Sequence, residues 1–142
     1  GVVFGQVRVV STAELERALG NAKGGERIEL APGRYDRLTL TGRRGVPVSW
    51  PSAVTVTSAD PNNPATLSAL DLRFVDNLTF TNLVFGYRFS AGDIQRTKPF
   101  MLRDVSRITI RASGPWFQNW PIACARSKPG WPWRNSGRRT CS

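Results

Sequence analysis

The sequence predicts an all-β solenoid of about three turns, closed at its start by one α-helix. Three observations lead to this fold class. A helical pattern occurs near the start of the chain, and from residue 27 to residue 111 short strand patterns alternate with turns. Within that region a six-residue pattern recurs after thirty residues. Such a period is typical of coils in which each turn stacks on the one before it.

The helix is predicted over residues 12–23, after a short strand at 7–10. Ser11 and Glu14 match the two ends of a capping box, in which the hydroxyl and the carboxylate each accept a backbone N–H. An apolar stripe at helical spacing follows, formed by Leu15, Ala18, Leu19 and Ala22. A helix in this position would cover the open end of the solenoid core.

The stretch 27–35 reads Arg-Ile-Glu-Leu-Ala-Pro-Gly-Arg-Tyr and combines a strand with a sharp turn. Its apolar residues alternate with charged ones, and Pro32-Gly33 suits a type II turn. Further strands are predicted at 38–40, 54–58, 70–74, 78–80, 83–85, 100–103 and 108–111. The side chains expected to point inward are Ile28, Leu30, Leu38, Leu40, Val54, Val56, Leu72, Leu78, Phe80, Ile108 and Ile110.

The repeat comprises residues 75–80, Val-Asp-Asn-Leu-Thr-Phe, and residues 105–110, Val-Ser-Arg-Ile-Thr-Ile. Both copies have valine, two polar residues and then threonine between two apolar residues. In a solenoid the two copies would stack, and their apolar side chains would form continuous inward ladders. A β-sandwich built from hairpins is the competing interpretation, but the sequence contains no Asn-Gly or Asp-Gly hairpin turn.

Several segments resemble right-handed parallel β-helix proteins of the pectate-lyase-like superfamily. The order Ser-Thr-Ala-Glu-Leu, helix, then Gly-Gly-Glu-Arg-Ile-Glu-Leu-Ala-Pro-Gly-Arg-Tyr looks like the N-terminal cap and first turn of that superfamily. Residues 45–48 and 54–60 are similar to the following segment of its alginate lyase and chondroitinase B branch. Residues 77–82, Asn-Leu-Thr-Phe-Thr-Asn, resemble its generic turn repeat.

This resemblance covers residues 7–111 and implies a secreted or cell-surface, polysaccharide lyase-like protein that acts on acidic polysaccharide, with Ca²⁺ in the full-length parent. Lyases of this kind need a basic residue and acidic Ca²⁺ ligands several turns into the coil. The repeat stops before that point, because Ala112–Pro115 do not continue it. No catalytic or metal-binding residue is therefore assigned, and this chain by itself is expected to be inactive.

Residues 112–142 form a second region with a different composition. They hold four of the five tryptophans, both cysteines, five basic residues and no acid. We expect this tail to be out of frame or disordered and to pack on nothing, with the chain truncated or frame-shifted after about residue 111. The alternative is a cationic aromatic segment that binds nucleic acid or an anionic membrane. If the solenoid stops near its third turn, its last strands leave an unpaired edge that is open to self-association.

Two places are candidate binding sites. The formal net charge of +10 favours a polyanion as partner, and the chain has no histidine for general base or metal-ligand roles. A polar loop over residues 87–98 supplies the predicted substrate-binding residues Tyr87, Arg88, Asp93, Arg96 and Lys98. Asp71 and Arg73 alternate with apolar residues, so they should face outward and could touch a glycan. Ordinary solvated surface remains the alternative at both places. Residues 42–45 could bind an anion, but a tight basic turn is the plainer interpretation.

Three function classes follow from these observations. The first is the N-terminal part of a secreted β-helix protein that acts on acidic polysaccharide. The second is a β-helix that binds glycans or surfaces without catalysis. The third is a protein whose cationic aromatic tail binds nucleic acid or an anionic membrane.

Overall fold

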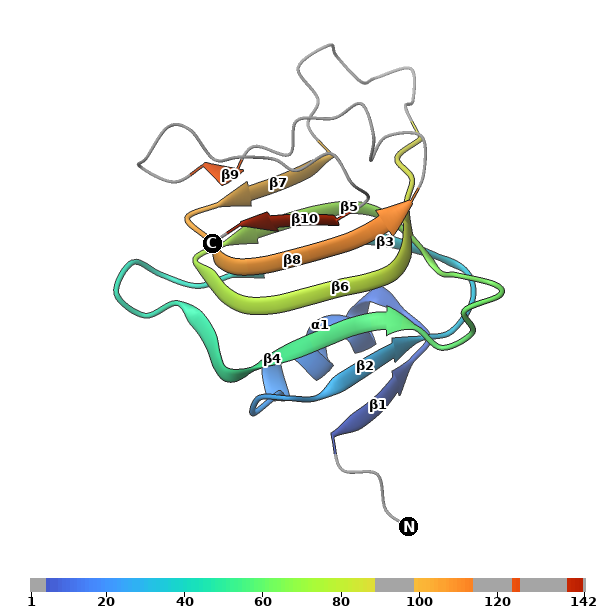
Figure 1. Ribbon diagram of the computed structural model, residues 1–142, viewed down its shortest axis with the longest axis horizontal. Coiled ribbons are helices and arrows are strands. Elements are labelled where there is room, and N and C mark those ends of the chain that lie inside the picture. Colours follow the sequence, from blue (N-terminus) through green and yellow to red (C-terminus); the bar gives the residue numbers. More distant parts are fainter. Residues whose placement is uncertain (1–4, 89–98, 114–123, 126–137, 142) are drawn as a thin grey trace.

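The computed structural model describes residues 5–88, 99–113, 124–125 and 138–141. The described chain is mostly β-structure, with one short helix and a mainly parallel sheet that curls on itself (Figure 1). The predicted all-β class with an N-terminal helix is therefore confirmed. The elements are β1 (Gln6–Val9), α1 (Thr12–Asn21), β2 (Arg27–Leu30), β3 (Arg34–Thr41), β4 (Val48–Ser58), β5 (Thr66–Arg73), β6 (Val75–Phe85), β7 (Phe100–Arg103), β8 (Ser106–Ser113), β9 (Cys124–Ala125) and β10 (Arg138–Cys141).

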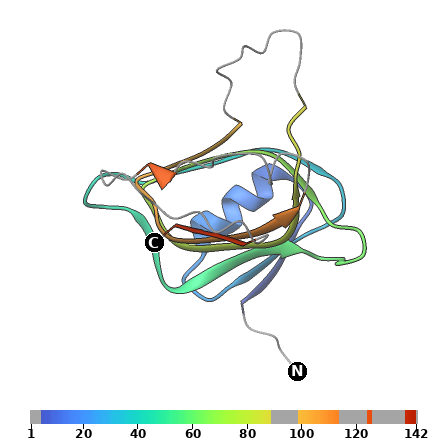
Figure 2. The same ribbon diagram turned by 45° about the horizontal axis from the view of Figure 1, so that its top comes forward.

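Helix α1 begins at the predicted capping box. The Ser11 hydroxyl accepts the Glu14 amide at 3.2 Å, and the Glu14 carboxylate accepts the Val10 amide at 3.3 Å. The helix ends at Asn21, before the predicted limit of 23, because Ala22 already has an extended backbone. Its apolar stripe buries Leu15 and Leu19, and the helix lies within the outline of the curled sheet (Figure 2).

The parallel strands form two rows, which are referred to below as the first and second rows. In the first row, β1, β2, β4, β6 and β8 follow one another, and Ile28, Val56, Phe80 and Ile110 are successive register partners. In the second row, β3, β5, β7 and β9 follow one another, with Leu38, Leu70 and Phe100 in register. The end of β6 pairs with the start of β5, which joins the rows and curls the sheet.

The thirty-residue repeat is confirmed by the register between β6 and β8. Leu78 pairs with Ile108, and Phe80 pairs with Ile110. The corners that precede these pairs also match, because a positive φ occurs at Phe74 and Asn77 in the first copy and at Asp104 and Arg107 in the second. A left-handed residue lets a strand bend sharply and then continue, so β6 runs from 75 to 85 where two shorter strands were expected.

The core lies between the two rows. All side chains predicted to point inward are buried except Leu40, which is half-buried and packs against the core. Aromatic residues that the sequence pattern did not single out also contribute: Phe85 stacks on Phe100 with ring centroids 4.9 Å apart, and Trp50 is buried. The described part of the chain therefore has one continuous hydrophobic core.

The tail differs from expectation where the structure describes it. Strand β8 extends to Ser113, beyond the expected boundary at 111, since the sheet register continues past the end of the repeat. Arg138–Cys141 pairs with β8 as an antiparallel strand, and Cys124–Ala125 pairs with β7. The expectation that residues 112–142 pack on nothing is therefore wrong for these two short strands, because the last strands present unpaired backbone groups that they satisfy.

Candidate functional site

Three segments of the chain turn at the same end of the sheet, one above another. The Gly42 amide donates to the Arg73 carbonyl oxygen at 2.7 Å, and the Phe74 amide donates to the Arg103 carbonyl oxygen at 3.1 Å. The Val48 amide donates to the Phe74 carbonyl oxygen at 2.9 Å. These bonds hold the segments that follow β3, β5 and β7 in a stack, to the left in Figure 1. Five arginines of this end are called the arginine corner below: Arg43, Arg44, Arg73, Arg103 and Arg107.

Arg73 and Arg103 lie next to each other on the outer face of the second row. They are register partners on β5 and β7, and the neighbouring Leu72 and Leu102 point into the core. Parallel strands are about 4.8 Å apart, so the two guanidinium groups start from adjacent backbone positions. Arg73 is exposed, and its guanidinium carbon lies 5.8 Å from the centroid of the Phe74 ring.

One carboxylate accompanies this pair. The Asp71 Oδ1 atom lies 3.5 Å from Nη2 of Arg103, which is an ion-pair distance but leaves Oδ1 without a hydrogen bond in the described structure. The Arg103 Nε atom is likewise occluded and without a hydrogen-bond partner there. Asp71 therefore orients Arg103 without using all of its donors, and no ion pair among the described residues includes Arg73.

Arg43 and Arg44 extend the corner into solvent. They lie in a turn closed by two reciprocal backbone bonds between Arg43 and Val46, at 3.1 and 2.9 Å. The predicted tight basic turn is confirmed. Glycine is required at position 42, because a Cβ atom there would lie 2.4 Å from the Phe74 carbonyl oxygen. Both arginines are exposed, and no ion pair among the described residues includes either of them.

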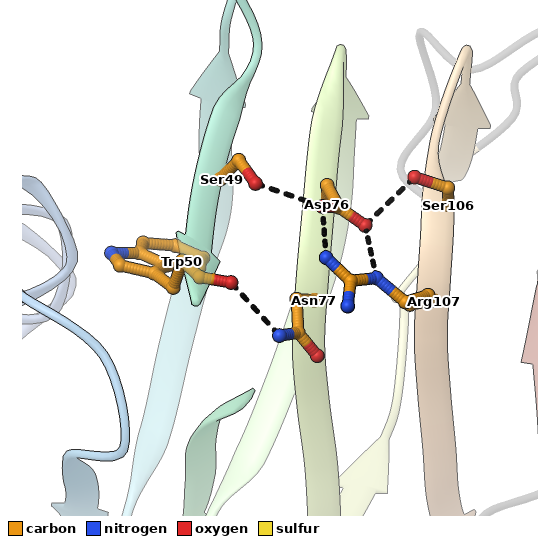
Figure 3. A network of polar contacts seen from close by, with 6 residues as sticks. All are labelled: Ser49, Trp50, Asp76, Asn77, Ser106 and Arg107. Atoms are coloured by element: carbon orange, nitrogen blue, oxygen red, sulfur yellow. Dashed lines mark hydrogen bonds and ion pairs between the residues drawn. The ribbon is translucent and has the colours of Figure 1, made fainter. Parts of the chain in front are cut away.

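Asp76 anchors the fifth arginine (Figure 3). Its carboxylate accepts hydrogen bonds from Ser49 Oγ and Ser106 Oγ, both at 2.8 Å, and from Arg107 Nε at 2.8 Å and Nη2 at 2.5 Å. The bidentate bond from Arg107 is the main cause that holds the pKa of Asp76 well below its usual range, despite partial burial. Arg107 remains 57% exposed, whereas Asp76 is 17% exposed. The anchor therefore fixes the base of an arginine that still faces solvent.

A second set of bonds ties this corner to the helix. The Asn77 side-chain amide donates to the Trp50 carbonyl oxygen at 2.9 Å, as Figure 3 shows, and the Trp50 indole N–H donates to the Ala22 carbonyl oxygen at 3.1 Å. Ala22 caps the C-terminal end of α1. The connection from α1 to β6 therefore runs through one buried tryptophan.

The predicted loop site lies at the other end of the strands. Tyr87 is half-buried and packs against the core, while Arg88 is exposed. Asp93, Arg96 and Lys98 lie outside the described residues. Next to the start of the loop, the Arg34 guanidinium donates to the Gly86 carbonyl oxygen. The structure thus places Tyr87 and Arg88 near the beginning of β5 and the arginine corner at its end.

The outward direction predicted for Asp71 and Arg73 is confirmed, but the sequence reasoning missed the residues that accompany them. The thirty-residue period could have indicated some of these residues. Arg103 lies thirty positions after Arg73, and Arg107 lies thirty positions after Asn77. Nothing in the sequence pattern indicated that Arg107 pairs with Asp76, because this bond joins side chains on two different strands.

Within the described ranges, no group of three or more acidic, cysteine or histidine side chains could hold a metal ion, and no helix is long and apolar enough to cross a membrane. What the arrangement can do is bind anions, because several guanidinium groups face solvent around a rigid corner. Searches of family models, curated proteins and solved structures find no match to this chain.

Proposed function

We propose that the curled sheet is a right-handed parallel β-helix and that the protein binds acidic polysaccharide at the arginine corner, as part of a secreted carbohydrate-active protein. The observation that carries this proposal is the adjacent placement of Arg73 and Arg103 on the outer face of neighbouring strands. Two like charges side by side are unfavourable unless an anion or an acid compensates them. Asp71 supplies one acid for the two guanidinium groups, which leaves the position suited to an external carboxylate or sulfate.

The β-helix assignment is supported by the way in which successive strands return to equivalent positions. Each row continues in register through three or more strands, and the positive-φ corners recur after thirty residues. This is the arrangement expected when each turn of a coil stacks on the previous one. It also explains why arginines far apart in sequence collect at one corner.

Polymer geometry favours polysaccharide over a small anion. The corner presents several separate cationic groups, so a chain with a charge on each repeating unit can engage more than one of them at once. The net charge of +10 would also speed the approach of a polyanion. Strand β5 has eight residues and spans roughly 26 Å, so a polymer lying along it could also reach Tyr87 and Arg88, the described members of the proposed loop site.

The test is a binding measurement with matched charge changes. We expect the double variant Arg73→Ala/Arg103→Ala to bind alginate or polygalacturonate oligomers at least about tenfold more weakly than the unmodified protein, measured by isothermal titration calorimetry. The control is Arg17→Ala/Arg27→Ala, which removes the same charge from exposed positions on α1 and β2. Uncharged dextran should not bind.

Equal losses in both double variants would mean that binding follows total charge alone, and this would overturn the site. No binding by the unmodified protein at low salt would overturn the function. Tighter binding to an oligonucleotide than to either polyuronate would favour the nucleic-acid alternative.

A separate prediction concerns catalysis. Because no basic and acidic residues can be assigned as a lyase centre, we expect no cleavage of pectate, alginate or dermatan by this chain, with or without Ca²⁺. The measurement is the ultraviolet absorbance of unsaturated products. A signal that rises with protein concentration and falls in Arg96→Ala/Lys98→Ala would contradict the prediction and assign chemistry to the loop.

A further inference from the structure

The outer edge of β1 is an open sheet edge in the described structure. Strand β1 ends the path of paired strands, and β2 pairs with it on one side. In Figure 1 this strand lies at the lower end of the sheet, and helix α1 lies above it. The helix therefore covers the end of the core without covering the backbone of β1. Open edges of this kind pair readily with another strand.

The hydrogen bonds to β2 show which backbone groups remain free. The Arg27 and Ala31 amides donate to the carbonyl oxygens of Gly5 and Val9, so odd-numbered residues of β1 direct their backbone groups to β2. Along a strand these groups alternate in direction. The N–H and C=O groups of Gln6 and Arg8 therefore point to the open edge, where a second strand could reach them.

The side chains at this edge are compatible with a close approach. Val7 pairs with Ile28 on the core-facing side, yet it remains 39% exposed because none of the described strands lies beyond it. On the outer side, Arg8 is the register partner of Glu29, and the Gln6 amide donates to the Glu29 carboxylate. An acidic residue thus occupies the neighbouring position on β2 beside Arg8.

We propose that β1 pairs with β1 of a second copy, antiparallel, about a twofold axis that passes through Val7. In this register Gln6 lies opposite Arg8 of the partner subunit, and the reverse pair is equivalent. Each pair exchanges two hydrogen bonds through the groups that are free in the single copy. The two Val7 side chains meet at the axis and bury their exposed surface. The strand is self-complementary in this register, which is the requirement of an isologous dimer.

A cysteine at the axis tests the geometry directly. Residues that face each other in a non-hydrogen-bonded antiparallel pair have Cα atoms about 4.5 Å apart, which permits a disulfide. In a Cys124→Ser/Cys141→Ser background, Val7→Cys should form a disulfide-linked dimer under mild oxidation, detected on a non-reducing gel and by mass spectrometry. The control is Val46→Cys, an exposed valine in the turn after β3, which should stay monomeric. Equal dimer yields from both variants, or none from Val7→Cys, would overturn the register.

Proline at position 8 tests the hydrogen bonds. The Arg8 N–H points away from β2, so Arg8→Pro removes a donor to the second copy while the bonds within the chain remain. We expect its dimer to dissociate at least about tenfold more readily than that of Arg8→Ala in sedimentation velocity, because two inter-subunit bonds are lost. Two results would overturn the proposal. One is that the unmodified protein is monomeric at about 100 µM, a concentration at which even weak association is detected. The other is that the two variants have equal dimer affinities. If circular dichroism shows that Arg8→Pro does not fold, Val7→Lys replaces it: loss of the dimer supports the proposal, and an unchanged dimer refutes it.

Discussion

Asn77 and Arg107 occupy the same position in the two copies of the repeat, and they solve the same problem with different side chains. Both have a positive φ, 70° for Asn77 and 50° for Arg107. Asparagine tolerates this left-handed conformation, whereas for arginine it costs about 1 kcal/mol or more. Each side chain nevertheless reaches back to the preceding strand of the first row: Asn77 donates to Trp50 on β4, and Arg107 donates to Asp76 on β6.

This comparison separates what the backbone requires from what the side chain adds. The corner conformation is the same because β6 and β8 stack in register, so it does not depend on the residue type. The side chain then offsets the cost of that conformation with a bond to the strand before it. In Arg107 the same side chain also leaves a positive charge exposed at the surface, which connects the stability of the corner with its proposed binding role.

The largest effect is expected in the core ladder just beyond these corners. Phe80 and Ile110 are register partners, and both are fully buried. Phe80→Ala should lower the free energy of unfolding by about 4 kcal/mol, and Ile110→Ala by about 3 kcal/mol, since β8 has no further parallel strand beyond it in the described structure. Urea denaturation followed by circular dichroism measures both values. Thr79→Ala and Thr109→Ala, which face outward, serve as controls and should cost far less. A larger loss for Ile110→Ala would contradict this order.

The next effect distinguishes the two corners themselves. Asn77→Ala removes the bond to Trp50, and the alanine must still adopt a positive φ without a side-chain bond that offsets its cost. We therefore expect the free energy of unfolding to fall by about 2 to 3 kcal/mol. Asn77→Gly loses the bond but relieves the backbone, and its loss should be about 1 kcal/mol smaller. At Arg107 the glycine variant should likewise be more stable than the alanine variant. Identical stabilities for alanine and glycine at both positions in thermal denaturation would show that the corners carry no backbone strain.

The smallest effect concerns pH. The pKa of Asp76 is lowered in the folded protein by its bond with Arg107, so the carboxylate contributes stability above its unfolded value of about 3.9 and loses that contribution as the pH falls through the folded value. At pH 7, Asp76→Asn should therefore destabilise the protein by about 1 to 2 kcal/mol. The difference in stability from the unmodified protein should shrink steadily below pH 4.

Asp104→Asn, which replaces an exposed acid at a corner with φ 52°, is the matched control and should change the stability little. A difference for Asp76→Asn that is constant from pH 7 to pH 2 would refute the ion-pair explanation.

Local pattern was sufficient for much of the fold. The capping box at Ser11 is confirmed because its bonds join residues three positions apart. The inward ladder was predictable because strands alternate sides, and the repeat showed that 78–80 and 108–110 are equivalent. Strand limits were less accurate: β3 and β4 begin well before the predicted strands, since pairing with neighbours extends a strand beyond its own apolar core.

The candidate site was less predictable than the fold. The sequence indicated that Arg73 faces outward, and the period placed Arg103 one strand away from it. It did not indicate that Arg43 and Arg44 turn at the same end, because this depends on the stacking of Gly42 on Arg73 and of Phe74 on Arg103. The loop at 87–98 drew attention by composition alone, and its described residues lie at the opposite end of β5.

The sequence by itself determined an all-β chain with one capped helix, a thirty-residue repeat and the side chains that form its core, because each of these follows from the order of neighbouring residues. Only the tertiary structure decided that the end of β6 returns to the start of β5, that five arginines gather at one corner, and that Asp76 holds Arg107. The physical reason is that these contacts join different strands, and their geometry is set by how the strands stack and curl.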